Sequence, residues 1–158
     1  PYEGILYAGV MITNRGPKLI EFNCRFGDPE TQVVLPRLNT DLVSIVQKTI
    51  KKNLKEMTID FISQNAITVV IASKGYPGEF KKGVLLPSLK NFNDESEIYV
   101  FHSGTSKDKN GNIVSNGGRV LSITSVGANV QDCRQKAYGI VEAINWEQGF
   151  YRKDIGKL

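Results

Sequence analysis

The hydrophobic pattern near the start of the sequence predicts a β-hairpin. Residues 4–13 alternate small and large apolar side chains, as the strands of a sheet do. Residues 14–17 read Asn-Arg-Gly-Pro, a composition typical of turns, and residues 18–23 continue as a second short apolar strand. This stretch is therefore expected to form two antiparallel strands joined by a tight turn.

The second predicted strand continues into a row of polar side chains. Because alternate side chains of an extended strand point to the same face, Glu21, Asn23 and Arg25 are expected to share one face. Phe22 and Cys24 are then expected on the other face, packed against the rest of the protein. The pattern predicts a strand with one polar and one buried face.

Two helices are predicted after the hairpin. Residues 28–30 read Asp-Pro-Glu, which is typical of a helix start, with Asp28 as the capping acid and proline at the first helical position. Pro36 should end this helix within about two turns. Residues 41–55 place apolar side chains at helical spacing with lysines on the other side, which predicts a longer amphipathic helix.

The pattern changes to strands after residues 60–65, where periodicity fails. Turn residues separate the apolar segments, and a helix capped by Asn129 follows, with an apolar stripe that ends at Ile144. The expected fold class is therefore α+β, with strands and helices in residues 1–62 and a small β-rich, barrel-like or sandwich-like module with one helix in residues 63–158. The strands predicted in this module are residues 67–72, 83–86, 97–102, 113–115 and 119–126.

The composition is that of an ordinary globular protein with a mild charge. Of the 158 residues, 41% are hydrophobic and 23% are charged, and no apolar run is long enough to cross a membrane. The net charge of +4 is spread along the chain without clusters of basic and aromatic residues. Neither a membrane nor a nucleic acid is therefore an expected partner.

The cysteines and the opening residues bear on the cellular context. Cys24 and Cys133 lie far apart without metal-binding spacing, so both are expected to be reduced core residues, in a cytoplasmic protein. There is no signal-peptide pattern, and residues 1–4 read Pro-Tyr-Glu-Gly, without an initiating methionine. We expect the sequence to be part of a longer polypeptide.

The polar face of the second strand has the residue types of a metal and anion site. Glu21 and Asn23 carry hard oxygen atoms of the kind that Mg²⁺ prefers, and side chains two residues apart on a strand can reach one ion. Arg25 adds a planar cation suited to carboxylate or phosphate. An ordinary strand, turn and capped helix would show the same pattern, so the residues alone leave both interpretations open.

Three residues in the β-rich half have both a functional and a structural interpretation. Lys74 opens a Lys-Gly-Tyr-Pro-Gly loop whose glycines allow a ligand to approach the backbone, but a plain hairpin turn would look the same. Arg119 follows Asn-Gly-Gly and could either reach an anion or lie in solvent. His102 lies in an apolar strand, where a lone histidine is expected to be a core or hydrogen-bonding residue rather than a catalyst.

Residues 21–32 carry a resemblance to a known enzyme family. They read Glu-Phe-Asn-Cys-Arg-Phe-Gly-Asp-Pro-Glu-Thr-Gln, which resembles the signature of glycinamide ribonucleotide synthetases, the phosphoribosylamine–glycine ligases of the ATP-grasp superfamily. The resemblance spans essentially the whole chain but only the C-terminal part of the family's length. Further segments similar to the family are residues 6–11, 72–78, 100–105, 117–121 and 151–156.

The resemblance implies ATP-dependent joining of glycine to phosphoribosylamine, a step of purine synthesis. It implies a glycyl phosphate intermediate, ATP as co-substrate, Mg²⁺ or Mn²⁺ as the metal, and small molecules as the binding partners. It also implies that residues 1–62 are the C-terminal part of an ATP-grasp domain. The implied roles are metal binding for Glu21 and Asn23, catalysis for Arg25, positioning of the substrate amine for Asp28, and binding of the ribose phosphate for Lys74 and Arg119.

The chain departs from the superfamily pattern at one strand, and it also has an alternative interpretation. Residues 6–11 lack the further metal-binding acid that many ATP-grasp enzymes have on the preceding strand. The ATP-binding lobes should precede Pro1, within about 260 further residues, so this fragment alone is expected to be inactive. The alternative is a non-enzymatic β-rich interaction or carrier module, although Lys109 is a poor match to the modified lysine of a carrier domain.

Overall fold

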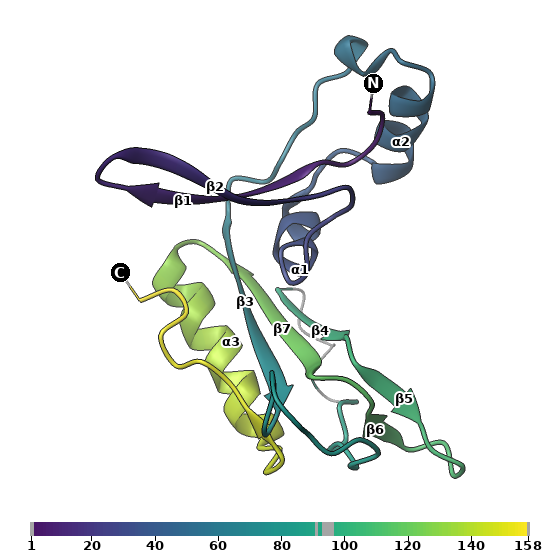
Figure 1. Ribbon diagram of the computed structural model, residues 1–158, viewed down its shortest axis with the longest axis vertical. Helices are drawn as coiled ribbons and strands as arrows, with labels where there is room; N and C mark the ends of the chain where they lie inside the picture. The colour runs from purple at the N-terminus through teal and green to yellow at the C-terminus, as the bar shows by residue number, and fades with distance from the viewer. Residues whose placement is uncertain (1, 91, 93–96, 158) are drawn as a thin grey trace. The chain divides into compact units, whose positions relative to one another are not determined.

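The computed structural model describes residues 2–90, 92 and 97–157. The chain divides into two compact units, Pro1–Ile62 and Ser63–Leu158 (Figure 1). Among the described residues, no helix is long and apolar enough to span a membrane. Each unit is described by itself below.

The first unit contains the predicted hairpin. Strand β1 (Tyr7–Thr13) pairs antiparallel with β2 (Gly16–Asn23), and the pairing shifts by one residue at a bulge between Gly9 and Val10. Because of the bulge, Gly9 lies opposite Glu21 and Tyr7 lies opposite Asn23. The hairpin is therefore confirmed, and its register brings the start of β1 beside the polar end of β2.

The expected burial of one face of β2 is wrong for this chain. Phe22 is 59% exposed, Cys24 is exposed, and on the neighbouring strand Ile12 is 80% exposed. Both faces of this ribbon thus present apolar side chains to solvent, far more than single surface positions require. Alternation along β2 correctly places Glu21 and Asn23 on one face, but no part of the chain that the structure describes buries Phe22 and Cys24.

The helices of the first unit are shorter than predicted. Helix α1 (Thr31–Val34) continues into a 3-10 turn, η1 (Leu35–Arg37), and helix α2 (Leu42–Ile50) is followed by a second one, η2 (Leu54–Glu56). Helix α2 ends five residues earlier than expected, because Lys52 adopts a left-handed backbone conformation with φ of 57°. These short elements connect the hairpin to the second unit along the chain.

The N-termini of these two helices differ in their capping. Asp41 caps α2 as its carboxylate accepts the N–H of Ser44 at 2.7 Å, which lowers the pKa of that carboxyl. Asp28 does not cap α1, because the helix begins at Thr31 and the Asp28 carboxylate instead accepts the side-chain amide of Gln32 at 3.2 Å. The cap predicted at Asp28 is therefore wrong, and the carboxylate lies at the exposed surface.

The described residues of the second unit form a four-stranded antiparallel sheet in the order β4–β7–β3–β8. Helix α3 (Val130–Ile144) packs along β3 and β7, as Figure 1 shows. Its predicted cap is confirmed, because the Asn129 side chain accepts the N–H of Asp132 at 2.9 Å. The strands are β3 (Asn65–Ser73), β4 (Ile98–His102), β7 (Arg119–Gly127) and β8 (Gly149–Phe150), with a separate ribbon of β5 (Thr105–Lys107) and β6 (Ile113–Ser115).

The α+β fold class is confirmed, but the barrel-like or sandwich-like form of the module is not. In the described part of the chain the sheet stays open, with β4 and β8 as its edges. The strand expected at residues 83–86 is absent: Leu85 makes an isolated bridge to Val114, and Leu86 donates to Ile113 at 2.9 Å. Without that strand the sheet cannot curl closed, and α3 covers one of its faces instead.

Substitution of Leu121 tests where the core of the second unit lies. It is fully buried in β7, within the cluster that α3 completes through Ala137 and Val141. We expect Leu121→Ala to lower the free energy of unfolding by about 2–5 kcal/mol, because it leaves a cavity in a packed core. Urea denaturation of the chain measures this loss. The matched control is Leu85→Ala, which removes a 59% exposed side chain and should change the stability by less than about 0.5 kcal/mol; equal losses in both variants would contradict this placement of the core.

Candidate functional site

The predicted metal-binding residues lie side by side at the end of β2. The Asn23 side-chain amide donates to the Glu21 carboxylate at 3.1 Å, so the two side chains share the face that alternation predicted. A side chain at Gly9, on the opposite strand, would come within 3.1 Å of the Glu21 Cγ atom. Glycine at this position therefore leaves room for the Glu21 side chain.

Two residues that the sequence did not single out complete this end of the hairpin. The Tyr7 hydroxyl donates to the Glu30 carboxylate at 3.2 Å, which ties β1 to the segment before α1. The pKa of Tyr7 is raised, chiefly by desolvation. The hydrogen bond to Glu30, the negative charge of Glu30 and the negative charge of Glu21 raise it further. Tyr7 therefore remains a neutral donor within a region of carboxylates.

The geometry at Glu21 and Asn23 fits a hard divalent cation with partly external ligands. Glu21 is exposed and Asn23 is half-buried, so both oxygen-bearing groups are accessible. Among the described residues, no group of three or more His, Cys, Asp or Glu side chains could hold a metal ion. A pair of side-chain ligands is compatible with Mg²⁺, which often takes one or two protein carboxylates and completes its shell with water and substrate phosphates.

Arg25 and Asp28 lie beyond the strand rather than in line with it. Strand β2 ends at Asn23, and the Arg25 guanidinium donates to the carbonyl of Phe26 at 2.7 Å. The side chain is exposed and bonded only locally among the contacts described. The structure thus brings Glu21 and Asn23 into contact and places Arg25 and Asp28 on the loop that follows.

Lys74 directly follows β3, and Arg119 opens β7, the strand that pairs with β3 in the second unit. Arg119 opens β7 opposite Ala72, and the N–H of Ser73 donates to the Gly118 carbonyl at 2.7 Å. A side chain at Gly118 would overlap the ring of Tyr76, so this glycine allows the loop after Lys74 to pack against the start of β7. The two basic residues therefore belong to one end of the β3–β7 pair.

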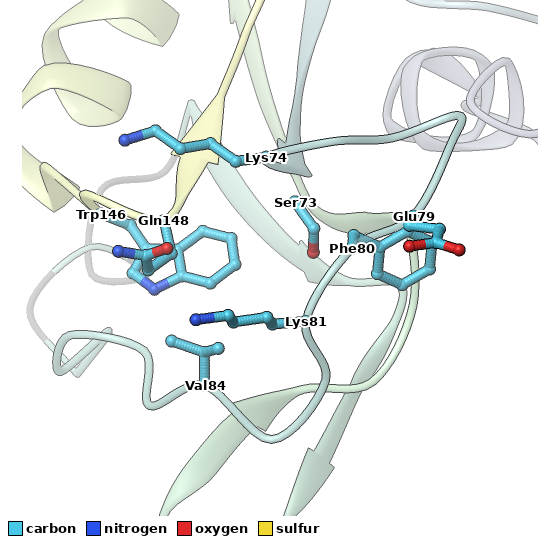
Figure 2. A pocket seen from close by; sticks show the side chains of 8 residues that line it. All are labelled: Ser73, Lys74, Glu79, Phe80, Lys81, Val84, Trp146 and Gln148. Carbon is cyan, nitrogen blue, oxygen red and sulfur yellow. The ribbon is translucent and has the colours of Figure 1, made fainter.

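Lys74 lines a pocket of about 420 Å³ in the second unit. Its backbone N–H donates to the carbonyl of Gln148 at 2.9 Å, which fixes the start of the loop. Arg119 is not among the described residues that line this pocket. The lining residues, shown in Figure 2, are Ser73, Lys74, Glu79, Phe80, Lys81, Val84, Trp146 and Gln148.

Two further side chains have structural roles. Trp146 is buried, and its ring N–H donates to the Leu85 carbonyl at 3.0 Å, as expected of a packing anchor. His102 is exposed at the end of β4, where its Nδ1 atom lies 3.0 Å from the Thr105 hydroxyl. His102 is thus a hydrogen-bonding residue of the surface, outside both groups of candidate site residues.

The sequence comparisons match both units to one class of protein. Residues 66–158 match the family described as phosphoribosylglycinamide synthetase, C domain, and residues 1–31 match phosphoribosylglycinamide synthetase, ATP-grasp (A) domain. The chain therefore carries a segment that matches the ATP-grasp (A) domain and a segment that matches the C domain of this class.

Individual relatives agree with these matches. The chain is 46% identical to a phosphoribosylamine–glycine ligase of Brucella melitensis over 99% of its length, and 48% identical over 99% to the trifunctional purine biosynthetic protein adenosine-3 of Gallus gallus. A crystal structure of phosphoribosylamine–glycine ligase from Thermotoga maritima matches 94% of the chain with a TM-score of 0.72 and 32% identity. The chain belongs to the phosphoribosylglycinamide synthetase family. It spans 36% of the Brucella and Thermotoga proteins and 16% of the Gallus protein.

Proposed function

We propose that this chain is the C-terminal part of an ATP-dependent ligase that joins glycine to phosphoribosylamine, forming glycinamide ribonucleotide, ADP and phosphate. The observation that carries the proposal is family membership across both units, since relatives that match 98–99% of the chain are named phosphoribosylamine–glycine ligases. The contact between the Glu21 and Asn23 side chains at the end of β2, which brings two potential metal ligands together, supports it from the geometry.

The proposed reaction consists of two transfers. A carboxylate oxygen of glycine attacks the γ-phosphorus of ATP, the bond to the β-phosphate oxygen breaks, and ADP leaves. The amine of phosphoribosylamine then attacks the carbonyl carbon of glycyl phosphate, loses a proton, and expels phosphate. The protein must neutralise phosphate charge and hold the two reactants in line, because positioning and electrostatic stabilisation supply most of the catalysis in such transfers.

Glu21 and Asn23 are proposed to hold the divalent cation against the ATP phosphates. The bound Mg²⁺ or Mn²⁺ would supply a positive charge that offsets the charge on the transferring phosphoryl group. The Glu21 carboxylate and the Asn23 amide oxygen would provide the ligands once the Asn23 amide turns from its present hydrogen bond, in which its nitrogen donates to Glu21 at 3.1 Å. Tyr7 donates to Glu30 nearby. The remaining ligands would come from water and the nucleotide.

Arg25, Asp28 and the basic residues of the second unit are proposed to contact the other reactants. Arg25 would stabilise the acyl phosphate once its guanidinium leaves the Phe26 carbonyl, a contact that costs little to break because the side chain is exposed. Asp28 would accept a hydrogen bond from the substrate amine. Lys74 and Arg119 would bind the ribose phosphate, a part of the substrate that does not react.

The exposed apolar ribbon supports a longer functional protein. Both faces of the β1–β2 hairpin carry large exposed apolar side chains, and α2 exposes a further stripe. Exposed apolar area of this extent marks an interaction surface in a stable protein. We propose that residues of the longer polypeptide outside this chain cover it, with residues 1–62 completing an ATP-grasp domain and residues 63–158 forming the domain that follows. The exposed apolar side chains are Val10, Met11, Ile12, Leu19, Ile20 and Phe22 on the hairpin and Val43, Val46 and Ile50 on α2.

The activity is tested with the longer protein that contains this chain. The protein is incubated with ATP, Mg²⁺, glycine and phosphoribosylamine, and glycinamide ribonucleotide and ADP are detected by mass spectrometry. We expect product only when all substrates are present, and none from the 158-residue chain alone. Absence of product from the longer protein would refute the proposed function.

A further inference from the structure

We propose that Lys81 is a second cationic ligand for the substrate phosphate, acting with Lys74 in the pocket of the second unit. The inference rests on the proposed function for the identity of the ligand, a ribosyl phosphate, and on the structure for the residue. Lys81 lies seven positions after Lys74 in the segment that follows β3. The sequence pattern predicted a role for Lys74 but none for Lys81.

The pocket holds both lysines on one side. Figure 2 shows the side chains of Lys74 and Lys81 running in the same direction, with their ammonium groups toward the side where Trp146 and Gln148 lie. The Glu79 carboxylate lies at the other end of the pocket, in the direction of Phe80. The cationic end of the pocket is thus separated from its one acidic lining residue.

Neither lysine is neutralised by a described residue. Within residues 2–90, 92 and 97–157, neither Lys74 nor Lys81 has an ion pair or a side-chain hydrogen bond. Both side chains are exposed, so each ammonium can adjust to an incoming anion. Two unpaired cations beside one cavity favour a doubly charged group such as phosphate over a neutral ligand.

The walls of the pocket are held by hydrogen bonds, whereas the two lysine side chains are exposed. The Ser73 hydroxyl donates to the Gly117 carbonyl at 3.0 Å, the Lys74 N–H donates to Gln148, and the Trp146 ring N–H is bonded to Leu85. A volume of about 420 Å³ lies within the range of roughly 300–1,000 Å³ typical of small-molecule sites. The pocket therefore offers a hydrogen-bonded wall for a sugar and exposed cations for its phosphate.

Binding of ribose 5-phosphate to the 158-residue chain tests the inference directly. Trp146 is the single tryptophan of the sequence and lines the pocket, so its fluorescence reports occupancy there. We expect a saturable change with ribose 5-phosphate and none with ribose. Lys81→Ala should weaken binding about 10- to 100-fold, the loss of one charge-assisted hydrogen bond, and Lys81→Arg should retain most of it.

The matched control is Lys109→Ala, which removes the same charge from an exposed lysine between β5 and β6. It should bind ribose 5-phosphate as the unchanged chain does. Failure of the unchanged chain to bind, or equal affinity of the Lys81→Ala variant, would overturn the inference. Kinetics of the longer protein separate the two proposals: ligase activity with an unchanged phosphoribosylamine KM in Lys81→Ala refutes only the role of Lys81, whereas Lys81-dependent binding without ligase activity refutes only the proposed reaction.

Discussion

Replacing Glu21 with glutamine in the longer protein is expected to lower kcat about 100- to 1,000-fold. The change keeps the shape of the side chain but removes a charged oxygen ligand from the proposed metal site, and metal stabilisation of transferring phosphoryl groups is worth several kcal/mol. Stability should change little, because Glu21 is exposed at the end of β2. Steady-state rates at saturating substrates, measured over a range of Mg²⁺ concentrations, test this expectation.

The control for this variant is Glu56→Gln in the same unit. Glu56 pairs with Lys48 at 3.1 Å on the surface, so its loss should leave both kcat and the Mg²⁺ dependence unchanged. Asn23→Ala should act in the same direction as Glu21→Gln and raise the Mg²⁺ concentration needed for half-maximal rate. Unchanged rates in both site variants at limiting Mg²⁺ would rule out this pair as the metal ligands.

Substitutions at the proposed phosphate ligands and at Arg25 are expected to change different kinetic constants. Lys74→Ala should raise the KM for phosphoribosylamine about 10- to 100-fold with little change in the KM for ATP, because a contact to a non-reacting phosphate acts mainly through binding. Arg25→Ala should instead lower kcat, because its partner charge is largest near the transition state. Arg119→Ala is expected to follow Lys74→Ala. Complete steady-state kinetics with each substrate varied in turn measure the contrast.

Lys109→Ala again provides the matched control for the loss of a lysine charge, and all its constants should equal those of the unchanged protein. If Lys74→Ala and Arg119→Ala left the KM for phosphoribosylamine unaltered, the second unit would not contact the substrate. If Arg25→Ala changed only the KM for ATP, Arg25 would bind nucleotide rather than stabilise the acyl phosphate. Either result would contradict the role proposed here for the substituted residue.

Alternation along β2 predicted the Glu21–Asn23 contact but not the neighbours of the pair. If the pairing next to the turn continued without a bulge, Tyr7 would lie opposite Phe22. The shift between Gly9 and Val10 places Tyr7 opposite Asn23 instead. A bulge leaves no clear mark in the residue pattern. The partnership of Tyr7 with Glu30 was therefore not predictable from spacing.

Burial was predicted poorly for the hairpin, whose apolar side chains have too little packing against the described residues to be buried. Phe22 and Cys24 belong to a strand with an apolar face, and the sequence correctly gives that face but cannot say what covers it. In contrast, Cys133 on α3 is fully buried as expected. The strands β3 and β7, against which α3 packs, belong to the same chain. Predictions made from local pattern succeed where the packing partner is also in the chain.

The loop that holds Lys81 shows a further limit. Residues 83–86 have the composition of a strand, but their backbone follows β6 only through isolated contacts, so the segment remains a loop that lines the pocket. Lys81 therefore lies in a connection whose path is set by tertiary contacts such as those of Trp146. A separation of seven residues in sequence could not predict that the Lys81 side chain lines the same pocket as Lys74.

Transfer of oxygen from glycine to phosphate tests the proposed ligase reaction most directly. The longer protein is supplied with ATP, phosphoribosylamine and glycine labelled with ¹⁸O in both carboxylate oxygens, and the products are analysed by mass spectrometry. Reaction through glycyl phosphate predicts that each inorganic phosphate carries one labelled oxygen and that the glycinamide ribonucleotide retains the other. Unlabelled phosphate, or release of pyrophosphate and AMP, would contradict it.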